Sequence, residues 1–260
     1  MLLLGLSLAA IFPLLARRAP LPYPATTAAF FDTAKIEGIA FLESDSNAVA
    51  PDPARAVVRD EHAGVPMFGM DTEPVFGGDL PEKWGRAQAE ISQQLKVVAL
   101  CRDGQRCPAA ARELIRLSSE GAGRSGRARV GLINRAVNLA IGPASDEAQW
   151  GVPDHWSAPF ETIQSRRGDC EDYAIVKYAA LLEAGVSADD LKLVVLKSAF
   201  PNEDHAVLAV RVDGEWLLLD NRTLTLVRDT DVVRAMPEFM LDDHGVRRFV
   251  SANRHRQSVS

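Results

Sequence analysis

The spacing of apolar residues changes once along the chain, from a helical period to a period of two. Over residues 79–100 apolar side chains recur every three or four positions, with Asp79 placed to cap a helix and Pro81 suited to its first turn. Residues 108–120 and 128–141 repeat this helical pattern. The positions that we expect to face the core in the first and third helices are Trp84, Ala87, Ile91, Leu95, Val98, Val130, Ile133, Val137 and Ile141.

A fourth predicted helix begins at Cys170 and ends at Gly185, a residue type that suits a helix C-terminus. The segment before it, residues 142–169, holds three prolines and two tryptophans without a period, which predicts a long loop. The inward positions of the Cys170 helix are expected to be Ala174, Ile175, Tyr178, Leu181 and Leu182.

Strand patterns follow the helices. Asp213 and Gly214 form a tight hairpin signal between two of these strands. Helices first and an antiparallel meander afterwards indicate an α+β fold. Residues 30–78 show no clear period, and we expect an irregular linker region with at most one strand. The predicted strands lie within residues 191–200, 205–214, 215–221, 223–229 and 244–251.

The N-terminus indicates export. The first sixteen residues carry no charge, and this run is too short for a typical membrane span but suits the apolar core of a secretory signal. Cleavage after Ala29 would place Thr27 at the −3 position. Arg17 and Arg18 follow the apolar run instead of preceding it, so residues 1–29 are either a signal peptide or an uncleaved membrane anchor.

The charge balance and the cysteine content further narrow the classes of protein to which the chain could belong. The chain has 29 basic and 35 acidic residues, a net charge of −6, so no general basic field would attract nucleic acid. Cys101 and Cys107 bracket a short polar loop and could form a disulfide in an oxidising compartment, although the sequence does not show the geometry. A metal site there is disfavoured because no other Cys or His lies nearby. Cys170 would then be the free thiol.

Three residues combine into candidate hydrolase chemistry. Cys170 follows Asp169, a good N-cap candidate, and the unpaired N–H groups of a first helical turn favour a thiolate. His205 starts a strand expected to lie against this helix. Asp220 ends the next strand, at the same end of the hairpin, so Asp220 or its neighbour Asn221 could orient the imidazole. This is the nucleophile, base and orienter arrangement of a cysteine hydrolase.

Each of the three residues also has an ordinary interpretation. A lone cysteine is more often a small buried residue, a lone histidine a surface or capping residue, and a lone aspartate a turn residue. Their order, with a helix-start Cys, a strand His and a strand-end Asp, favours catalysis over coincidence.

The segments around these residues resemble a known family. "WGVPDHWSAPFETIQSRRGDCEDYAIVKYAALLEAGV", "HAVLAV" and "LLLDN" are similar to the bacterial transglutaminase-like cysteine proteinases of the LapG family, over roughly residues 80–246. The resemblance implies a papain/transglutaminase-like α+β fold over residues 79–250, with a helical lobe packed on a β lobe. It implies Cys170 as nucleophile, His205 as general base and acid, and Asp220 as orienter.

The same resemblance implies a biological setting. Members of the family are periplasmic, calcium-dependent proteases that cut the N-terminal region of large surface adhesins, and an inner-membrane cyclic-di-GMP receptor sequesters them. The family's calcium ligands correspond to Asp169 and Glu171, with Asp172, loop carbonyls or Asp154 as further candidates. Hard oxygen ligands suit Ca²⁺, which would offset the negative charge beside the thiol. The alternative is that Asp169 only caps and Glu171 is a solvated first-turn acid.

Two further points stay open. The oxyanion of a tetrahedral intermediate needs hydrogen-bond donors. The backbone N–H of Cys170 is one candidate and the indole N–H of Trp156 another, although a tryptophan there is more often a packing residue.

The same triad could run transamidation instead of hydrolysis. An inactive receptor-binding module or a plain structural protein would leave the ordered Cys, His and Asp unexplained.

Overall fold

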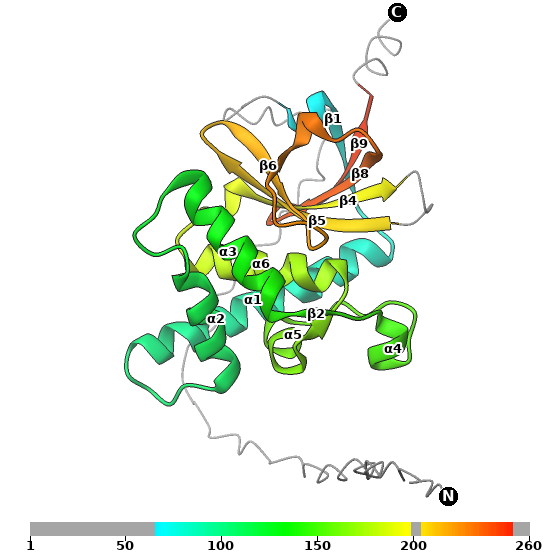
Figure 1. Ribbon diagram of the computed structural model, residues 1–260. Helices are drawn as coiled ribbons and strands as arrows, with labels where there is room; N and C mark the ends of the chain where they lie inside the picture. The colour runs from blue at the N-terminus through cyan, green and yellow to red at the C-terminus, as the bar shows by residue number, and fades with distance from the viewer. Residues whose placement is uncertain (1–65, 199–203, 252–260) are drawn as a thin grey trace, which may run out of the picture. The chain divides into compact units, whose positions relative to one another are not determined.

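A layer of helices covers one face of a seven-stranded antiparallel sheet (Figure 1). The structure, a computed structural model, describes residues 66–198 and 204–251. The predicted signal or anchor segment, residues 1–29, and residues 30–65 of the predicted linker lie outside this part. The helices are α1 Asp79–Arg102, α2 Ala109–Ser119, α3 Gly126–Ala140, α4 Asp146–Trp150, α5 Pro159–Ser165 and α6 Cys170–Glu183.

The strands come mainly after the helices, as an α+β order requires. Short 3-10 turns, η2 Met67–Gly69, η3 Ala188–Asp190 and η4 Asp229–Asp231, connect or flank them. The sheet order is β1-β9-β8-β4-β5-β6-β7, and β2 pairs with β3 in a separate parallel ladder. The strands are β1 Asp71–Val75, β2 Gly142–Pro143, β3 Arg167–Gly168, β4 Leu191–Ser198, β5 Asp204–Val212, β6 Glu215–Leu219, β7 Val227–Arg228, β8 Ala235–Asp242 and β9 Gly245–Val250.

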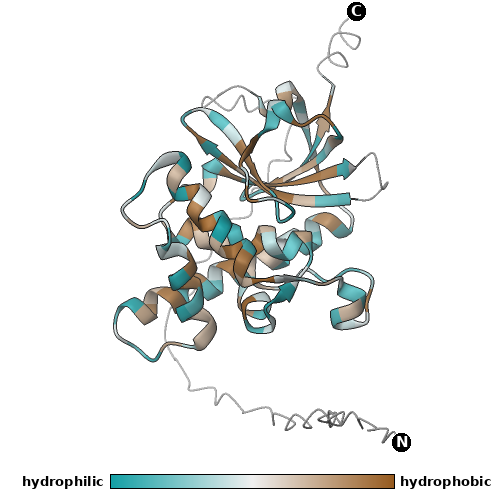
Figure 2. Ribbon diagram, viewed as in Figure 1, coloured by the Kyte–Doolittle hydropathy of each residue, from teal (hydrophilic) through white to brown (hydrophobic). Residues whose placement is uncertain are grey.

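Helix α6 is the central element of the core. It contacts β4 and β5 on the sheet side and α2, α3 and α5 on the other sides, so all residues from Asp172 to Leu181 are buried. This burial on every face explains why its pattern is only weakly amphipathic. Figure 2 shows hydrophobic residues gathered where the helices meet the sheet. The positions predicted to face the core in the first, third and fourth helices are all buried or packed against this cluster.

A second, smaller apolar cluster lies on the other face of the sheet, where Val194, Val207 and Leu218 pack with Met67 of η2. Side chains of successive strand residues point to opposite faces, so a sheet covered on both faces gives nearly continuous apolar strands. This accounts for the run of buried residues in β5.

The structure confirms the predicted hairpin. Val212 pairs with Glu215, and the turn residues Asp213 and Gly214 have φ values of 52° and 82°. Two consecutive positive φ angles are the signature of a type I′ turn, which Asp-Gly favours. The turn fixes the register of β5 against β6 and so places His205 and Asp220 at one end of the sheet.

The structure corrects three predictions. The strands do not form a simple meander, because β8, which sequence patterning missed, pairs with β4 and carries β9 with it. Strand β8 contains Pro237 and has mostly half-exposed residues, so its pattern is weak. Helix α1 begins with Asp79 itself, and Gly78 occupies the N-cap without a side-chain bond. The predicted loop 142–169 holds α4, α5, β2 and β3.

The short elements in that loop have local causes. Ser145 caps α4 by accepting a hydrogen bond from Ala148 N at 3.3 Å, and Pro159 opens α5. Helices of seven residues or fewer show too little periodicity to be recognised from apolar spacing. Among the helices of the described residues, none is long and apolar enough to cross a membrane.

Candidate active site and metal site

The start of α6 is held against the β2–β3 pair. Gly142 N donates to Arg166 O at 2.8 Å, and Ala144 N donates to Gly168 O at 2.9 Å. Gly168 must lack a side chain, because a Cβ there would lie 2.6 Å from Oδ2 of Asp172. Asp172 is fully buried, and its Oδ1 accepts from Ser157 N at 2.8 Å. These contacts fix the two residues that follow Gly168, Asp169 and Cys170.

His205 and Asp220 come together at the same end of the sheet. Nε2 of His205 lies 2.9 Å from Oδ1 of Asp220. The β5–β6 ladder ends with the pair Leu208 and Leu219, and His205 and Asp220 lie just past that pair on their two chain segments. The same Oδ1 accepts from Arg222 N at 2.9 Å, which closes a local turn. The carboxylate of Asp220 is therefore anchored to the backbone as well as to the imidazole.

The charge state of Asp220 follows from these contacts. Burial alone would raise the pKa of Asp220, but hydrogen bonds from His205 and Arg222 N, together with the charge of Lys177, hold this pKa below its usual value. Asp220 is therefore ionised at neutral pH. An ionised acceptor at Nε2 fixes the orientation of the ring and leaves Nδ1 as its second nitrogen. Nδ1 of His205 is buried and has no hydrogen-bond partner among the described residues.

Cys170 is the first residue of α6. Helix α6 packs on β5, the strand that carries His205. The thiol itself donates to Oε2 of Glu171 at 3.1 Å. Burial and then the charge of Glu171 raise the pKa of Cys170, and the Ala206 N–H opposes them in part. The described structure thus holds the cysteine as a thiol that is bonded to a carboxylate, next to the histidine strand.

Three acids cluster near the start of α6. Asp146, Asp169 and Glu171 each offer one carboxylate oxygen, and these oxygens lie within 4.8 Å of one another. Burial, followed by the charges of Glu171 and Asp146, raises the pKa of Asp169 to about 8. Burial also raises the pKa values of Asp146 and Glu171. Like charges gathered in a partly buried place are unfavourable unless a proton or a cation compensates them.

The geometry at Asp169 favours a cation over a cap. Asp169 occupies the N-cap of α6, but its side chain makes no capping hydrogen bond. Its Oδ1 is buried without a partner among the described residues. A buried carboxylate oxygen without a donor is costly, and a hard cation would satisfy it. The residues that could hold such a cation are therefore Asp146, Asp169 and Glu171.

Asp146 was not among the ligands expected from the sequence. It lies 23 residues before Asp169 in the segment that was predicted to be a loop, and only the β2–β3 pairing brings it close. Asp154, which was suggested as a ligand, instead pairs with Lys83. Asp172 follows Glu171 in the sequence; its Oδ2 is buried without a hydrogen-bond partner in the described part of the chain, and burial raises its pKa to about 8.

The other expected site residues lie as follows. Trp156 is half-buried and packs against the core cluster between helices and sheet, so its role in an oxyanion hole stays a prediction. Cys101 and Cys107 are joined by a disulfide with a Cα–Cα distance of 4.8 Å. Cys170 is the free cysteine.

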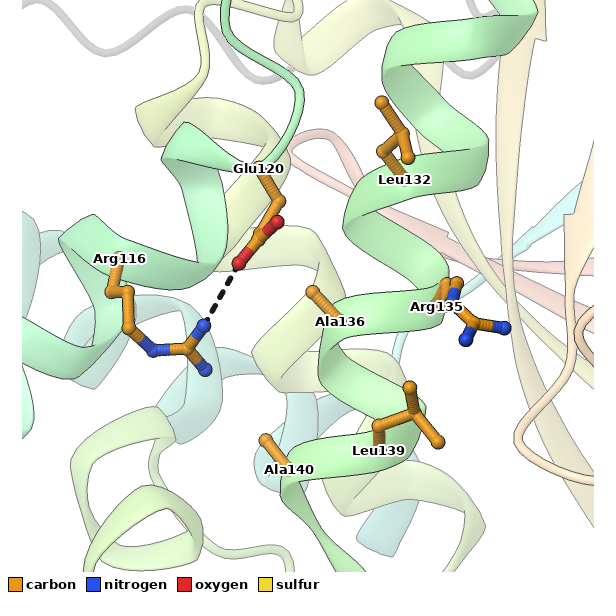
Figure 3. A pocket seen from close by; sticks show the side chains of 7 residues that line it. All are labelled: Arg116, Glu120, Leu132, Arg135, Ala136, Leu139 and Ala140. Carbon is orange, nitrogen blue, oxygen red and sulfur yellow. Dashed lines mark hydrogen bonds and ion pairs between the residues drawn. The ribbon is translucent and has the colours of Figure 1, made fainter.

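A surface hollow of about 240 Å³ lies elsewhere, between α2 and α3 (Figure 3). The ion pair of Arg116 with Glu120 borders it, and the side chains of Leu132 and Leu139 flank it. It contains none of the predicted catalytic or metal-binding residues, so we do not assign chemistry to it.

Comparison with known proteins identifies the family. The family described as bacterial transglutaminase-like cysteine proteinase (BTLCP) matches residues 90–232, which include Cys170, His205 and Asp220. The chain belongs to this family. It is therefore a cysteine protease of the transglutaminase-like type, and the α+β fold predicted from the sequence is confirmed. No curated protein matches the chain.

Solved structures of similar chains were also found. LapG of Legionella pneumophila in its calcium-bound form is 22% identical, with a TM-score of 0.48, and the match covers 63% of this chain and 92% of that one. The EGTA-treated form of the same protein is 21% identical, with a TM-score of 0.49, and the match covers 64% of this chain and 92% of that one.

Proposed function

We propose that this protein is an exported, calcium-dependent cysteine endopeptidase that uses Cys170, His205 and Asp220. The observation that carries this proposal is a half-buried thiol at the start of α6, the helix that packs on β5, where His205 is joined to Asp220 at 2.9 Å. Family membership supports the protease activity. Each of the three side chains has the chemistry that its role needs.

The reaction begins with proton transfer from the Cys170 thiol to Nδ1 of His205, the ring nitrogen that makes no hydrogen bond within residues 66–198 and 204–251. Asp220 accepts at Nε2 and stabilises the imidazolium that forms. The thiolate then attacks the scissile carbonyl carbon, and the backbone N–H of Cys170 and the indole N–H of Trp156 are the proposed donors to the oxyanion. The imidazolium protonates the leaving amine, and a water activated by His205 hydrolyses the thioester.

The thiol must leave its carboxylate acceptor before this can happen. In the described structure it donates to Glu171, and the charge of Glu171 opposes thiolate formation. We propose that Asp146, Asp169 and Glu171 hold Ca²⁺. The bound ion would supply positive charge beside the sulfur and engage the carboxylate that competes for the thiol proton.

We further propose that the substrate is the N-terminal region of a large cell-surface adhesin and that the enzyme works in the periplasm. The resemblance of the sequence around Cys170 to the LapG proteases supports this substrate, and the apolar N-terminal run supports export. An inner-membrane cyclic-di-GMP receptor is the proposed regulatory partner, which would sequester the protease and so delay the release of a biofilm.

Cleavage of an adhesin N-terminal fragment by the purified protein tests the proposal. The reaction is run with calcium, with a chelator and with Cys170→Ala. Cleavage that requires both calcium and Cys170 is the expected result. Cleavage that survives the chelator would remove the calcium part of the proposal. Transfer of an added amine to the fragment, in place of hydrolysis, would show a transglutaminase.

A further inference from the structure

Lys177 is a buried lysine that the mechanism above does not use. It lies on α6 two turns after Cys170, and its side chain is fully buried. Its Nζ donates to Leu219 O at 3.0 Å, the carbonyl directly before Asp220. A buried lysine is rare because its charge loses hydration, so its position here calls for a compensating role.

A second side chain holds the next carbonyl. Nδ2 of Asn138 on α3 donates to Asp220 O at 2.9 Å and to Thr223 O at 3.0 Å. Two helices therefore each provide one donor, and these donors bind consecutive carbonyls on either side of the Cα of Asp220. This part of the chain has already left the β5–β6 ladder, which ends at Leu219, so the strand pairing does not hold it.

We propose that Lys177 and Asn138 are positioning residues, which clamp the main chain at Asp220 so that its carboxylate meets His205 at the orientation the protease needs. The inference rests on the proposed triad and adds two residues to it. Neither residue touches substrate or the reacting atoms. Their action passes through Asp220 and from there to the imidazole.

The charges around Lys177 agree with this role. Burial lowers the pKa of Lys177 to about 7, and the carboxylate of Asp220 opposes that shift. Of the charged groups on the described elements packed against α6, Asp220 is the one whose charge acts on Lys177, and the ring of Tyr173 lies 5.8 Å from Nζ. In return, the charge of Lys177 helps to keep Asp220 ionised beside His205.

Alkylation of Cys170 by iodoacetamide tests the clamp without a known substrate. Cys101 and Cys107 are paired, so Cys170 is the thiol that reacts, and its thiolate displaces iodide. In the full chain with calcium, an effective Cys–His pair gives alkylation that persists at mildly acidic pH, where an ordinary thiol is protonated. We expect Lys177→Met to lower this acid-side rate about tenfold or more, since misplacing an orienting group is costly.

Matched controls separate positioning from general stability. Lys192→Met removes another poorly exposed lysine, whose Nζ lies 2.6 Å from Asp242 Oδ2. Lys192 pairs with Ala209 of β5, far along β4 from Leu196, which pairs with His205. Asn138→Leu is compared with Asn134→Leu, one turn earlier on α3, where the buried amide makes no hydrogen bond among the described residues. Melting temperatures are recorded for all four variants.

The outcomes are distinct. A lower acid-side rate in Lys177→Met and Asn138→Leu, with rates near wild type in the two controls at similar melting temperatures, supports the clamp. Wild-type rates in both test variants overturn it, and so does a loss that follows melting temperature across all four. If the wild type itself reacts as an ordinary thiol, the proposed triad fails and the clamp fails with it.

Discussion

Asp146→Asn should stabilise the calcium-free protein and at the same time weaken its response to calcium. The substitution removes one charge of the three-acid cluster but keeps an oxygen that can accept the hydrogen bond from His155 N. Two unit charges 4.8 Å apart, the largest separation of these oxygens, would repel by about 3.5 kcal/mol at an effective dielectric constant of ~20, and partial protonation of Asp169, whose pKa is raised to about 8, lowers this repulsion at neutral pH. Solvent screening of the half-exposed Asp169 and Glu171 reduces the expected gain in unfolding free energy to about 1–3 kcal/mol.

The assay is urea unfolding at neutral pH, in chelator and in saturating calcium. In chelator the variant is expected to unfold at higher urea than the wild type. In calcium the order reverses, because the wild type has three carboxylates to bind the ion and the variant has two. Asp154→Asn is the control: its carboxylate lies in the same segment but pairs with Lys83 at the surface, so a change below about 1 kcal/mol is expected in both conditions.

A destabilised Asp146→Asn in chelator would refute this reasoning, because it would show that the Asp146 carboxylate is compensated without a metal. An unchanged response to calcium would show instead that the ion binds elsewhere. Unfolding in chelator tests the repulsion argument, and the change in stability on adding calcium tests the assignment of the metal site. One set of variants therefore tests the two separately.

Three further outcomes follow from the same geometry. The pKa values of Asp169 and Asp172 are raised to about 8, above their values in the unfolded chain, so the stability that these two groups contribute is complete at low pH and is lost as pH rises toward 8. The extra unfolding free energy given by calcium should therefore grow between about pH 5 and pH 8, as measured by urea unfolding. Gly168→Ala should destabilise by about 1–3 kcal/mol in the same assay, since its Cβ would lie 2.6 Å from Asp172 Oδ2, and an unchanged midpoint would contradict the close packing. Replacing Cys101 and Cys107 by serine should cost about 2 kcal/mol, because the loop that they close spans only six positions, and a melting temperature equal to wild type would contradict this.

The sequence was most informative where local rules decide the structure. The helical spacing over 79–100, the Asp213-Gly214 turn and the switch to alternation predicted the α+β order correctly. The turn also placed His205 and Asp220 at one end of a hairpin, where the structure joins them. Turn chemistry is a property of adjacent residues, and so the sequence carries it directly.

The parts that sequence patterning missed depend on distant partners. Asp146 becomes a candidate metal ligand only because β2 pairs with β3 across the segment for which the sequence predicts a loop. Strand β8 belongs to the sheet through its pairing with β4, although its own residues show little alternation. Lys177 looks like a solvent-exposed helix residue in the sequence, and its burial follows from helices on three sides of α6. Tertiary packing, which periodicity does not encode, decided all three.

The cysteine between two acids is explained by what each acid does in the structure. Glu171 takes the thiol hydrogen bond, and Asp169 has a buried oxygen that nothing in the described chain satisfies. Without a cation both carboxylates favour the protonated thiol, which is the inactive form of a nucleophile. A cation bound by the same two residues would remove that opposition at the position where the His205 ring is already aligned by Asp220. The acids beside Cys170 would then keep the protease inactive until calcium binds, because His205 and Asp220 are already oriented by contacts that need no metal.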